Sequence, residues 1–286
     1  MDSYILDTLE RDSPVLVIGM AGGGDLTTAY LMKKKLESWK FDNVYYGTCQ
    51  AILNADICDF YNSSGIYVPF FEELLEFIRE DFLLVSFQSG ITRSVLQFKN
   101  FLEQKNIQYV LGVNGGGNIL CSGTEKEILS PAINALSLTL LDKLKTRNNL
   151  CILGPGTAGG IMPGEFMENL NRVKQKKGFI GTSWLNEQDL ELLRLINEFR
   201  EQKNFFSRSN KGIQMALDGF AGIHTIGRTD VKLTEISSKM FWLKASVVNQ
   251  FNPFTQLVRT SQSIYEAYEV VNNWLAQNRV VKKSKR

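Results

Sequence analysis

The feature that most constrains the fold is a short apolar run that leads into a glycine-rich turn, within residues 15–29. Residues 15–18 are continuously apolar, which is typical of a parallel strand covered on both faces. Residues 22–24 are all glycine, and Asp25 then precedes a segment with a helical apolar face. The pattern predicts a strand, a turn whose backbone a ligand can approach closely, and a helix that Asp25 caps.

Two phosphate-binding motifs do not fit this turn. A P-loop requires Lys and then Ser or Thr after its last glycine, but Asp25 and Leu26 stand there. The dinucleotide motif G-x-G-x-x-G has Thr27 in place of its third glycine, and the expected ribose-binding acid is missing after the second strand, which leaves hydride transfer with NAD a weaker option. A carboxylate here would repel a bare phosphate by about 1–4 kcal/mol. Asp25 therefore favours a ligand with hydroxyls, an amine or a bridging cation, unless it only caps the helix.

Composition excludes several classes of protein. The chain has 286 residues, 44% hydrophobic and 22% charged, as expected of a globular protein with a sizeable core. A formal net charge of +2 gives no argument for nucleic acid or an anionic membrane as a partner. No apolar run is long enough to span a bilayer, and residues 1–4 do not resemble a secretory leader. We expect a cytoplasmic protein.

Cysteine and histidine usage argues against a metal site. The four cysteines, Cys49, Cys58, Cys121 and Cys151, form no C-x-x-C pair and are expected to be reduced, on or near buried strands. His224 is the single histidine, so no site with several histidine ligands can form. It stands in an apolar, strand-like segment, where a structural histidine is commoner than a catalytic base.

Strands alternate with helices along the first two thirds of the chain. The expected strands are 15–18, 43–48, 82–87, 107–113, 150–153 and 178–182, and the expected helices include 72–79, 92–105, 130–145 and 163–176. This alternation predicts an α/β fold with a doubly wound, mostly parallel, Rossmann-like sheet. In such a sheet the first five strands take the order 3-2-1-4-5, so the first and fourth are neighbours where the winding reverses.

The pattern changes after residue 183. We therefore expect a core at 1–183 and a C-terminal α+β extension at 184–286 that packs on it. The extension is expected to contain helices at 187–200, 210–217 and 255–278 and strand-like runs at 221–226 and 241–248. The basic tail at 280–286 is expected to be a solvated end, which makes nucleic acid an unlikely partner.

Glycine-rich turns follow the first, fourth and fifth expected strands. Ligands of doubly wound sheets bind in the crevice outside the carboxyl ends of the strands, where the winding reverses. Asp25 and Glu125 are the candidate acid/base or hydroxyl-binding groups. The candidate ligand-binding residues are Gly22, Gly23, Gly24, Thr27, Asn114, Gly116, Gly117, Asn118, Gly154, Gly156 and Thr157. The cofactor is unknown, and no metal ligand set is expected.

The chain resembles an archaeal family catalogued as domain of unknown function 1152. Four blocks in the expected order carry the resemblance: 22–25; 112–118 together with 123–125 and 130–131; 154–156; and 250–253. The family has no established function, so the resemblance implies a fold and a site position but no reaction.

The chain departs from the family pattern at four positions that are commonly acidic. Asn118, Asn134, Ala158 and Gly160 stand where the family usually has Asp or Glu. Asn cannot take a proton and binds a hard cation less strongly than a carboxylate. The resemblance therefore implies a divergent member. Two hypotheses remain: a protein that binds a nucleotide-like or phosphorylated metabolite, with or without catalysis, or a catalytically silent subunit that acts through oligomerisation or a protein partner.

Overall fold

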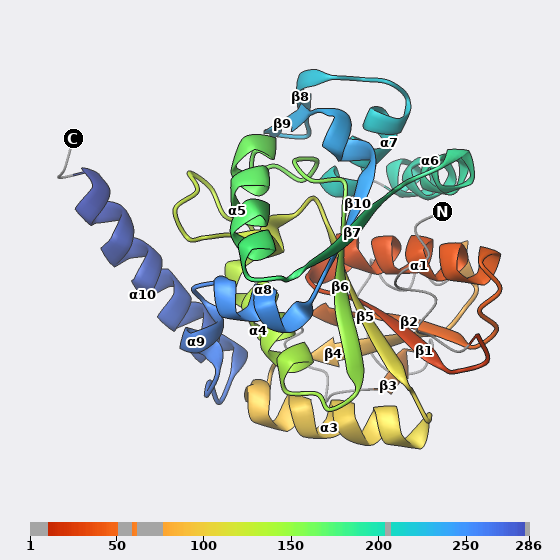
Figure 1. Ribbon diagram of the computed structural model, residues 1–286, viewed down its shortest axis with the longest axis horizontal. Coiled ribbons are helices and arrows are strands. Elements are labelled where there is room, and N and C mark those ends of the chain that lie inside the picture. Colours follow the sequence, from red (N-terminus) through yellow and green to blue (C-terminus); the bar gives the residue numbers. More distant parts are fainter. Residues whose placement is uncertain (1–10, 51–58, 62–76, 204–206, 284–286) are drawn as a thin grey trace.

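The computed structural model describes residues 11–50, 59–61, 77–203 and 207–283 (Figure 1). Its main sheet has eight strands in the order β3-β4-β2-β1-β5-β6-β10-β7. The strands are β1 (Val15–Gly19), β2 (Val44–Gln50), β3 (Asp59–Tyr61), β4 (Phe82–Ser86), β5 (Tyr109–Gly115), β6 (Arg147–Leu153), β7 (Phe179–Trp184) and β10 (Lys239–Leu243). The five strands β4, β2, β1, β5 and β6 pair in parallel. The predicted α/β class and the predicted order of the first five long strands are confirmed.

The side chains of β1 show why the strand is apolar throughout. Leu16 and Ile18 belong to the core cluster on one face of the sheet, whereas Val15 and Val17 belong to the cluster on the other face. Successive residues of a strand point to opposite faces. Because helices cover both faces, neither set is in contact with solvent, and all four side chains are fully buried.

Helices form a layer on each face of the sheet (Figure 1). On the Val15 face lie α1 (Gly22–Ser38), α6 (Glu187–Gln202) and α7 (Arg208–Leu217). On the Leu16 face lie α3 (Gly90–Gln104), α4 (Pro131–Asp142), α5 (Pro163–Gln175), α8 (Ala245–Phe251), α9 (Thr255–Val258) and α10 (Ile264–Lys283). None of the described helices is both long enough and apolar enough to cross a membrane.

The C-terminal part of the chain contributes a strand to the main sheet. β10 lies between β6 and β7 and is antiparallel to both. The strand-like run expected at 241–248 is thus correct only as far as Leu243, because helix α8 begins at Ala245. A second, two-stranded sheet is formed by β8 (Gly222–Ile226) and β9 (Thr229–Leu233), and β9 was not predicted.

The predicted closing helix at 255–278 is wrong as a single element. It is divided into α9 and α10. Ser263 explains where the second helix starts, because its hydroxyl accepts the backbone N–H of Glu266. The Glu266 carboxylate in turn accepts the backbone N–H of Gln262. These two hydrogen bonds satisfy the backbone N–H groups of Glu266 and Gln262, which an uninterrupted helix would have bonded to its own carbonyls.

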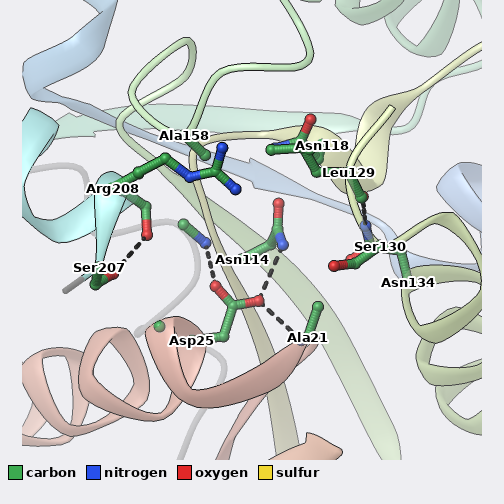
Figure 2. Close-up of a pocket in the computed structure, with 13 residues that line it drawn as sticks. Ala21, Asp25, Asn114, Asn118, Leu129, Ser130, Asn134, Ala158, Ser207 and Arg208 are labelled. Atoms are coloured by element: carbon green, nitrogen blue, oxygen red, sulfur yellow. Dashed lines mark hydrogen bonds between the residues drawn. The ribbon is translucent and has the colours of Figure 1, made fainter. Parts of the chain in front are cut away.

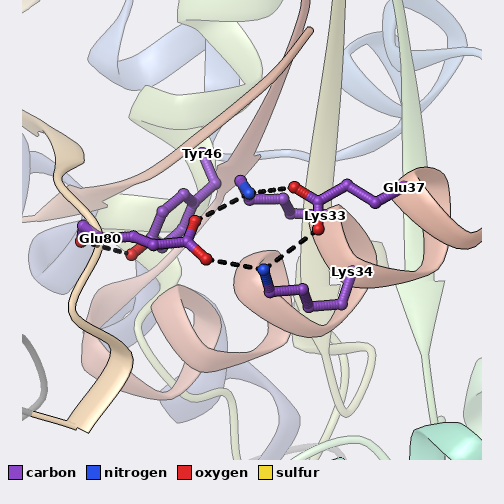
Figure 3. Close-up of polar contacts among 5 residues, drawn as sticks. All are labelled: Lys33, Lys34, Glu37, Tyr46 and Glu80. Atoms are coloured by element: carbon purple, nitrogen blue, oxygen red, sulfur yellow. Dashed lines mark hydrogen bonds and ion pairs between the residues drawn. The ribbon is translucent and has the colours of Figure 1, made fainter. Parts of the chain in front are cut away.

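A charged network joins the C-terminal half of α1 to the sheet (Figure 3). The Glu80 carboxylate forms ion pairs with Lys33 Nζ at 2.8 Å and with Lys34 Nζ at 2.6 Å. The Glu37 carboxylate, in the same helix as the two lysines, forms ion pairs with both of them as well. The hydroxyl of Tyr46 on β2 donates to the backbone carbonyl of Glu80 at 2.9 Å. The network fixes α1 in position, and with it the helix N-terminus at the carboxyl edge of the sheet.

Two predictions concern residues that are only partly described. The helix expected at 72–79 lies mostly outside the described residues, and Cys58 lies outside them. The other three cysteines are buried and free, as predicted. Burial raises the pKa of the Cys49 thiol to about 12, so this thiol stays protonated and unreactive at neutral pH.

Candidate functional site

A pocket of about 200 Å³ lies at the carboxyl edge of the sheet, where β1 and β5 are neighbours (Figure 2). It therefore occupies the predicted switch-point crevice. All three glycine-rich turns contribute to it, and so does the start of α7. The lining residues are Ala21, Gly24, Asp25, Asn114, Gly115, Asn118, Leu129, Ser130, Asn134, Ala158, Ser207, Arg208 and Ser209.

Asp25 is the one carboxylate among these lining residues, and it is held by three donors. Its Oδ1 accepts the backbone N–H of Gly115 at 2.9 Å, and its Oδ2 accepts the backbone N–H of Ala21 at 2.8 Å. Asn114 Nδ2 donates to Oδ2 at 3.0 Å. Burial raises the pKa of Asp25 from 3.8 to about 7, and the hydrogen bonds from Gly115, Asn114 and Ala21 limit the rise. The carboxyl group is thus poised to exchange a proton at neutral pH.

The predicted N-cap role of Asp25 needs a correction. Helix α1 begins at Gly22, and Ala21 is its N-cap, so Asp25 lies within the first turn. Its side chain folds back to accept the N–H of Ala21. The tight strand-to-helix turn also requires glycine at position 19, because a Cβ there would lie 2.6 Å from the carbonyl oxygen of Asp25.

Three helix N-termini converge on the pocket. Ala21 is the N-cap of α1 and Gly24 lies in its first turn, Ser130 is the N-cap of α4, and Ser207 is the N-cap of α7. The first backbone N–H groups of each helix have no acceptor within their own helix, and the helix dipole adds partial positive charge there. Together the three termini favour an anionic group in the pocket.

Ser130 has an unusual backbone at this place. Its φ is 51°, in the left-handed region that non-glycine residues rarely adopt. Although it is the N-cap of α4, its side chain makes no capping hydrogen bond. The residue is exposed and lines the pocket, so its hydroxyl is available to a ligand. Strained conformations of this kind are concentrated at functional sites.

Arg208 brings a positive charge to the pocket from the start of α7 (Figure 2). Its Nη1 donates to Thr229 Oγ1 on β9 at 2.6 Å, which fixes the guanidinium over the space that Asp25 and Asn114 face. Sequence reasoning missed Ser207, Arg208 and Ser209, because it began this helix at residue 210. The local signal was Ser207, whose hydroxyl accepts the backbone N–H of Asn210 as an N-cap.

Two asparagines complete the polar lining. Asn118 Oδ1 accepts the backbone N–H of Ile161 at 3.2 Å, so this amide is largely engaged in holding the loop. Asn134 Nδ2 donates to the backbone carbonyl of Leu129 at 3.1 Å. Asn134 Oδ1, however, is buried without a hydrogen-bond partner. An unpartnered buried acceptor beside a pocket indicates a place for a donor from a ligand or a water molecule.

The second candidate acid, Glu125, is not among the residues that line the pocket. Its Oε1 accepts Ser122 N at 2.7 Å, Ser122 Oγ at 2.9 Å and Asn169 Nδ2 at 2.8 Å. Burial alone would raise the pKa of Glu125, but these hydrogen bonds outweigh burial and hold the pKa below its usual value. In the structure Glu125 anchors the loop after β5 to α5.

Of the predicted binding residues, the structure brings Gly24, Asn114 and Asn118 into the pocket. The remaining eight are placed close by but do not line it: Gly22, Gly23, Thr27, Gly116, Gly117, Gly154, Gly156 and Thr157. Thr27 faces α6 and α7 instead, where Arg200 Nη1 donates to its hydroxyl at 3.2 Å.

The glycines of the second and third turns serve packing. Gly116 has a φ of 89°, and a Cβ there would lie 2.3 Å from Ala158 Cβ. A Cβ at Gly154 would likewise lie 2.3 Å from Ile213 Cγ1 of α7. These close approaches let the turns after β5 and β6 pack against each other and against α7, and so they shape the pocket from outside.

His224 lies outside the pocket, on the β8–β9 hairpin. Its Nε2 lies 2.9 Å from the carbonyl oxygen of Ala221, and its ring meets that of Phe220 edge-on. Within the described ranges no cluster of three or more His, Cys, Asp or Glu side chains is suited to a metal ion.

A second cavity, of about 340 Å³, lies at the opposite edge of the sheet. It is larger than the switch-point pocket and is lined by Lys99, Leu102, Glu103, Asn106, Ile107, Gln108, Lys145 and Thr146. Ligands of doubly wound folds bind at the carboxyl edge of the sheet rather than here.

Comparisons with known proteins identify a family but no activity. A search of curated proteins finds no match. One solved structure that resembles the chain, titled "Structure of the citrinin polyketide synthase CMeT domain", is 10% identical with a TM-score of 0.30. The match covers 85% of this chain and about half, 49%, of that chain. The fold assignment therefore rests on the strand order itself. A family profile described as "Protein of unknown function (DUF1152)" matches residues 40–278, and the chain belongs to this family.

Proposed function

We propose that the protein binds a small metabolite, nucleotide-like or phosphorylated, in the pocket at the switch point of the sheet. The observation that carries the proposal is the buried carboxylate of Asp25 in a pocket toward which three helix N-termini and Arg208 also point. A cleft with a few convergent polar groups and a titratable residue of shifted pKa is the usual description of a ligand site.

The charges in the pocket favour a ligand with an anionic group. Asp25 alone would repel a phosphate, but Arg208 and the helix N-termini oppose that repulsion. With a pKa of about 7, Asp25 also carries its full negative charge only part of the time at neutral pH. A phosphate near Arg208 and a hydroxyl or amine near Asp25 are compatible with this distribution of charge.

Catalysis by this pocket would depend on Asp25. Asn118 and Asn134 stand where the family pattern commonly has acids, and both line the pocket. We therefore propose a divergent member of the family that binds its ligand and has at most one acid/base group. Asp25 would then exchange the proton of a ligand hydroxyl.

A thermal-shift screen against nucleotides, dinucleotides and sugar phosphates, each with and without magnesium, tests the proposal. A ligand at 100 times its dissociation constant adds about 2.7 kcal/mol of stability, which raises the melting temperature by a few degrees. We expect at least one hit in the wild type whose thermal shift Asp25→Asn reduces. The matched control Asp230→Asn, an exposed acid on the β8–β9 hairpin, should keep the hit. A panel without hits, or hits that Asp25→Asn leaves unchanged, would contradict the proposal.

A silent subunit that acts through self-association is the second candidate, and strand β7 favours it. β7 is an edge strand of the main sheet and carries no charged residue or proline. Edge strands usually carry such residues, which discourage pairing with another chain. A Cβ at Gly181 would meet nothing within 4 Å, so Gly181→Lys should leave the fold intact and dissociate an oligomer that pairs through β7. Gly164→Lys, at an equally open position on α5, is the control. A monomeric wild type in analytical ultracentrifugation would exclude this candidate.

A further inference from the structure

The pocket offers two different kinds of contact to a ligand. Arg208 and the N-termini of α4 and α7 offer positive charge and N–H donors. Asp25 and Asn134 offer acceptors, and Asn134 Oδ1 has no partner among the described residues. A ligand that satisfies both kinds must carry an anion and a hydrogen-bond donor within a short distance of each other.

The size and lining of the pocket limit what else the ligand can carry. A volume of about 200 Å³ is below the roughly 300–1,000 Å³ of typical small-molecule sites. Among the described lining residues, the apolar side chains are Ala21, Leu129 and Ala158, and none is aromatic. A nucleobase would therefore find no ring to stack on and little apolar surface.

We infer that the ligand is a small phosphorylated polyol, in which the phosphate contacts Arg208 and two neighbouring hydroxyls donate, one to Asp25 and one to Asn134 Oδ1. This inference rests on the proposed function and specifies its ligand class. Phosphate suits the anion position better than a carboxylate, because its terminal oxygens accept several N–H donors at once from helix N-termini and a guanidinium. One hydroxyl donates to the unpartnered Asn134 Oδ1, and Asp25 accepts the proton of the adjacent hydroxyl.

Isothermal titration calorimetry with five probes tests each element of the inference. The probes are glycerol 3-phosphate, propyl phosphate without hydroxyls, glycerate with a carboxylate, glycerol without an anion, and adenosine monophosphate. We expect glycerol 3-phosphate to bind at least about tenfold more tightly than each of the others, the effect of one charge-assisted hydrogen bond. In Asp25→Asn and Asn134→Ala, the advantage over propyl phosphate should shrink severalfold. The binding of propyl phosphate itself should persist and show that the pocket is folded.

Variants of Arg208 test the phosphate position. Arg208→Gln should weaken glycerol 3-phosphate and propyl phosphate by the same factor, about tenfold or more. Thr229→Val removes the partner of Arg208 without removing the charge, and it should have a smaller effect. Arg172→Gln, which removes an exposed arginine on α5, should have none.

Four results would overturn the inference. If propyl phosphate binds as tightly as glycerol 3-phosphate, the ligand needs no hydroxyl. If glycerate binds as tightly, the anion position does not require a phosphate. Tighter binding of adenosine monophosphate, lost in Asp25→Asn, would refute a small polyol while the proposed function stands. Absence of binding by all five probes would refute the ligand class, and the wider thermal-shift panel would then decide the proposed function separately.

Discussion

Asn114 donates its side-chain N–H to Asp25 Oδ2 at 3.0 Å, and this contact joins the end of β5 to the first turn of the helix after β1. The two residues are 89 positions apart in the chain and meet because β1 and β5 are neighbours. Gly115, the residue after Asn114, donates its backbone N–H to the other oxygen of the same carboxylate. Asp25 thus holds the two sides of the pocket together and faces the ligand space as well.

The structural part of this role predicts a large loss of stability in Asp25→Ala. The substitution leaves the N–H groups of Ala21, Gly115 and Asn114 without their acceptor. An unsatisfied buried donor costs about 1–3 kcal/mol, so the loss should exceed the 0.5–2 kcal/mol of an N-cap. Urea denaturation of wild type and variant measures the difference. A loss below 0.5 kcal/mol would show that Asp25 does not hold the start of α1 to the end of β5.

The pKa of Asp25 predicts how stability depends on pH. Burial raises this pKa from 3.8 to about 7, so between pH 4 and 7 the folded protein binds more protons than the unfolded chain. Stability therefore falls as pH rises through this window and is affected no further above it. The full effect is on the order of 4 kcal/mol.

Asp25→Asn serves as the reference for this pH effect, since it removes the titrating group. The wild type should lose stability relative to the variant as pH rises from 4 to 7, measured by urea denaturation at each pH. A difference that stays constant across this window would show that Asp25 titrates at its ordinary pKa.

Glu125 is expected to act on stability rather than on the ligand. Glu125→Gln replaces charge-assisted hydrogen bonds to Ser122 and Asn169 by neutral ones, which should cost about 1–3 kcal/mol. Because the pKa of Glu125 lies below its usual value, the carboxylate's contribution is present above the unfolded pKa and is lost as pH falls through the folded one. Ligand affinity should change by less than about threefold. A tenfold loss of affinity in a folded variant would show that Glu125 contributes to ligand binding.

The packing role of the second glycine turn can be tested at Gly116. In Gly116→Ala the new methyl group would lie 2.3 Å from Ala158 Cβ, on a backbone with φ of 89°. The expected loss of stability is about 2–4 kcal/mol. Gly164→Ala is the control, because a Cβ there meets nothing within 4 Å and alanine favours the helix by up to about 1 kcal/mol. Equal melting temperatures of the two variants would contradict the packing argument.

Much of the fold could be predicted because its signals are local. One continuous apolar run at 15–18 and four further apolar-rich segments predict the five parallel strands, and the doubly wound fold then predicts their order. Element ends were less accurate where a local cap decides them, as at Ser263, which starts α10, and at Ser207, which starts α7. The insertion of β10 between β6 and β7 depends on long-range pairing that its sequence alone does not contain.

The site was predictable only in part, for a related reason. Asp25 follows β1, Asn114 lies at the end of β5 and Asn118 follows it, so the switch-point rule places them together. Arg208 reaches the pocket from a helix nearly 200 residues after β1, and nothing in the sequence near it indicates that contact. Glu125 lies on the loop after β5, and only three-dimensional placement shows that its carboxylate turns toward Ser122 and Asn169.

Amide chemical-shift changes in ¹⁵N-labelled protein locate the bound ligand residue by residue. The probe is glycerol 3-phosphate, or whichever compound gives the largest thermal shift. For a ligand in the switch-point pocket, we expect the largest changes at the N–H groups of Ala21, Gly115 and Ser209, with none at Asn106, Gln108 and Thr146 around the opposite cavity. Changes concentrated at the opposite cavity, or spread without relation to either pocket, would show that the ligand does not bind in the switch-point pocket.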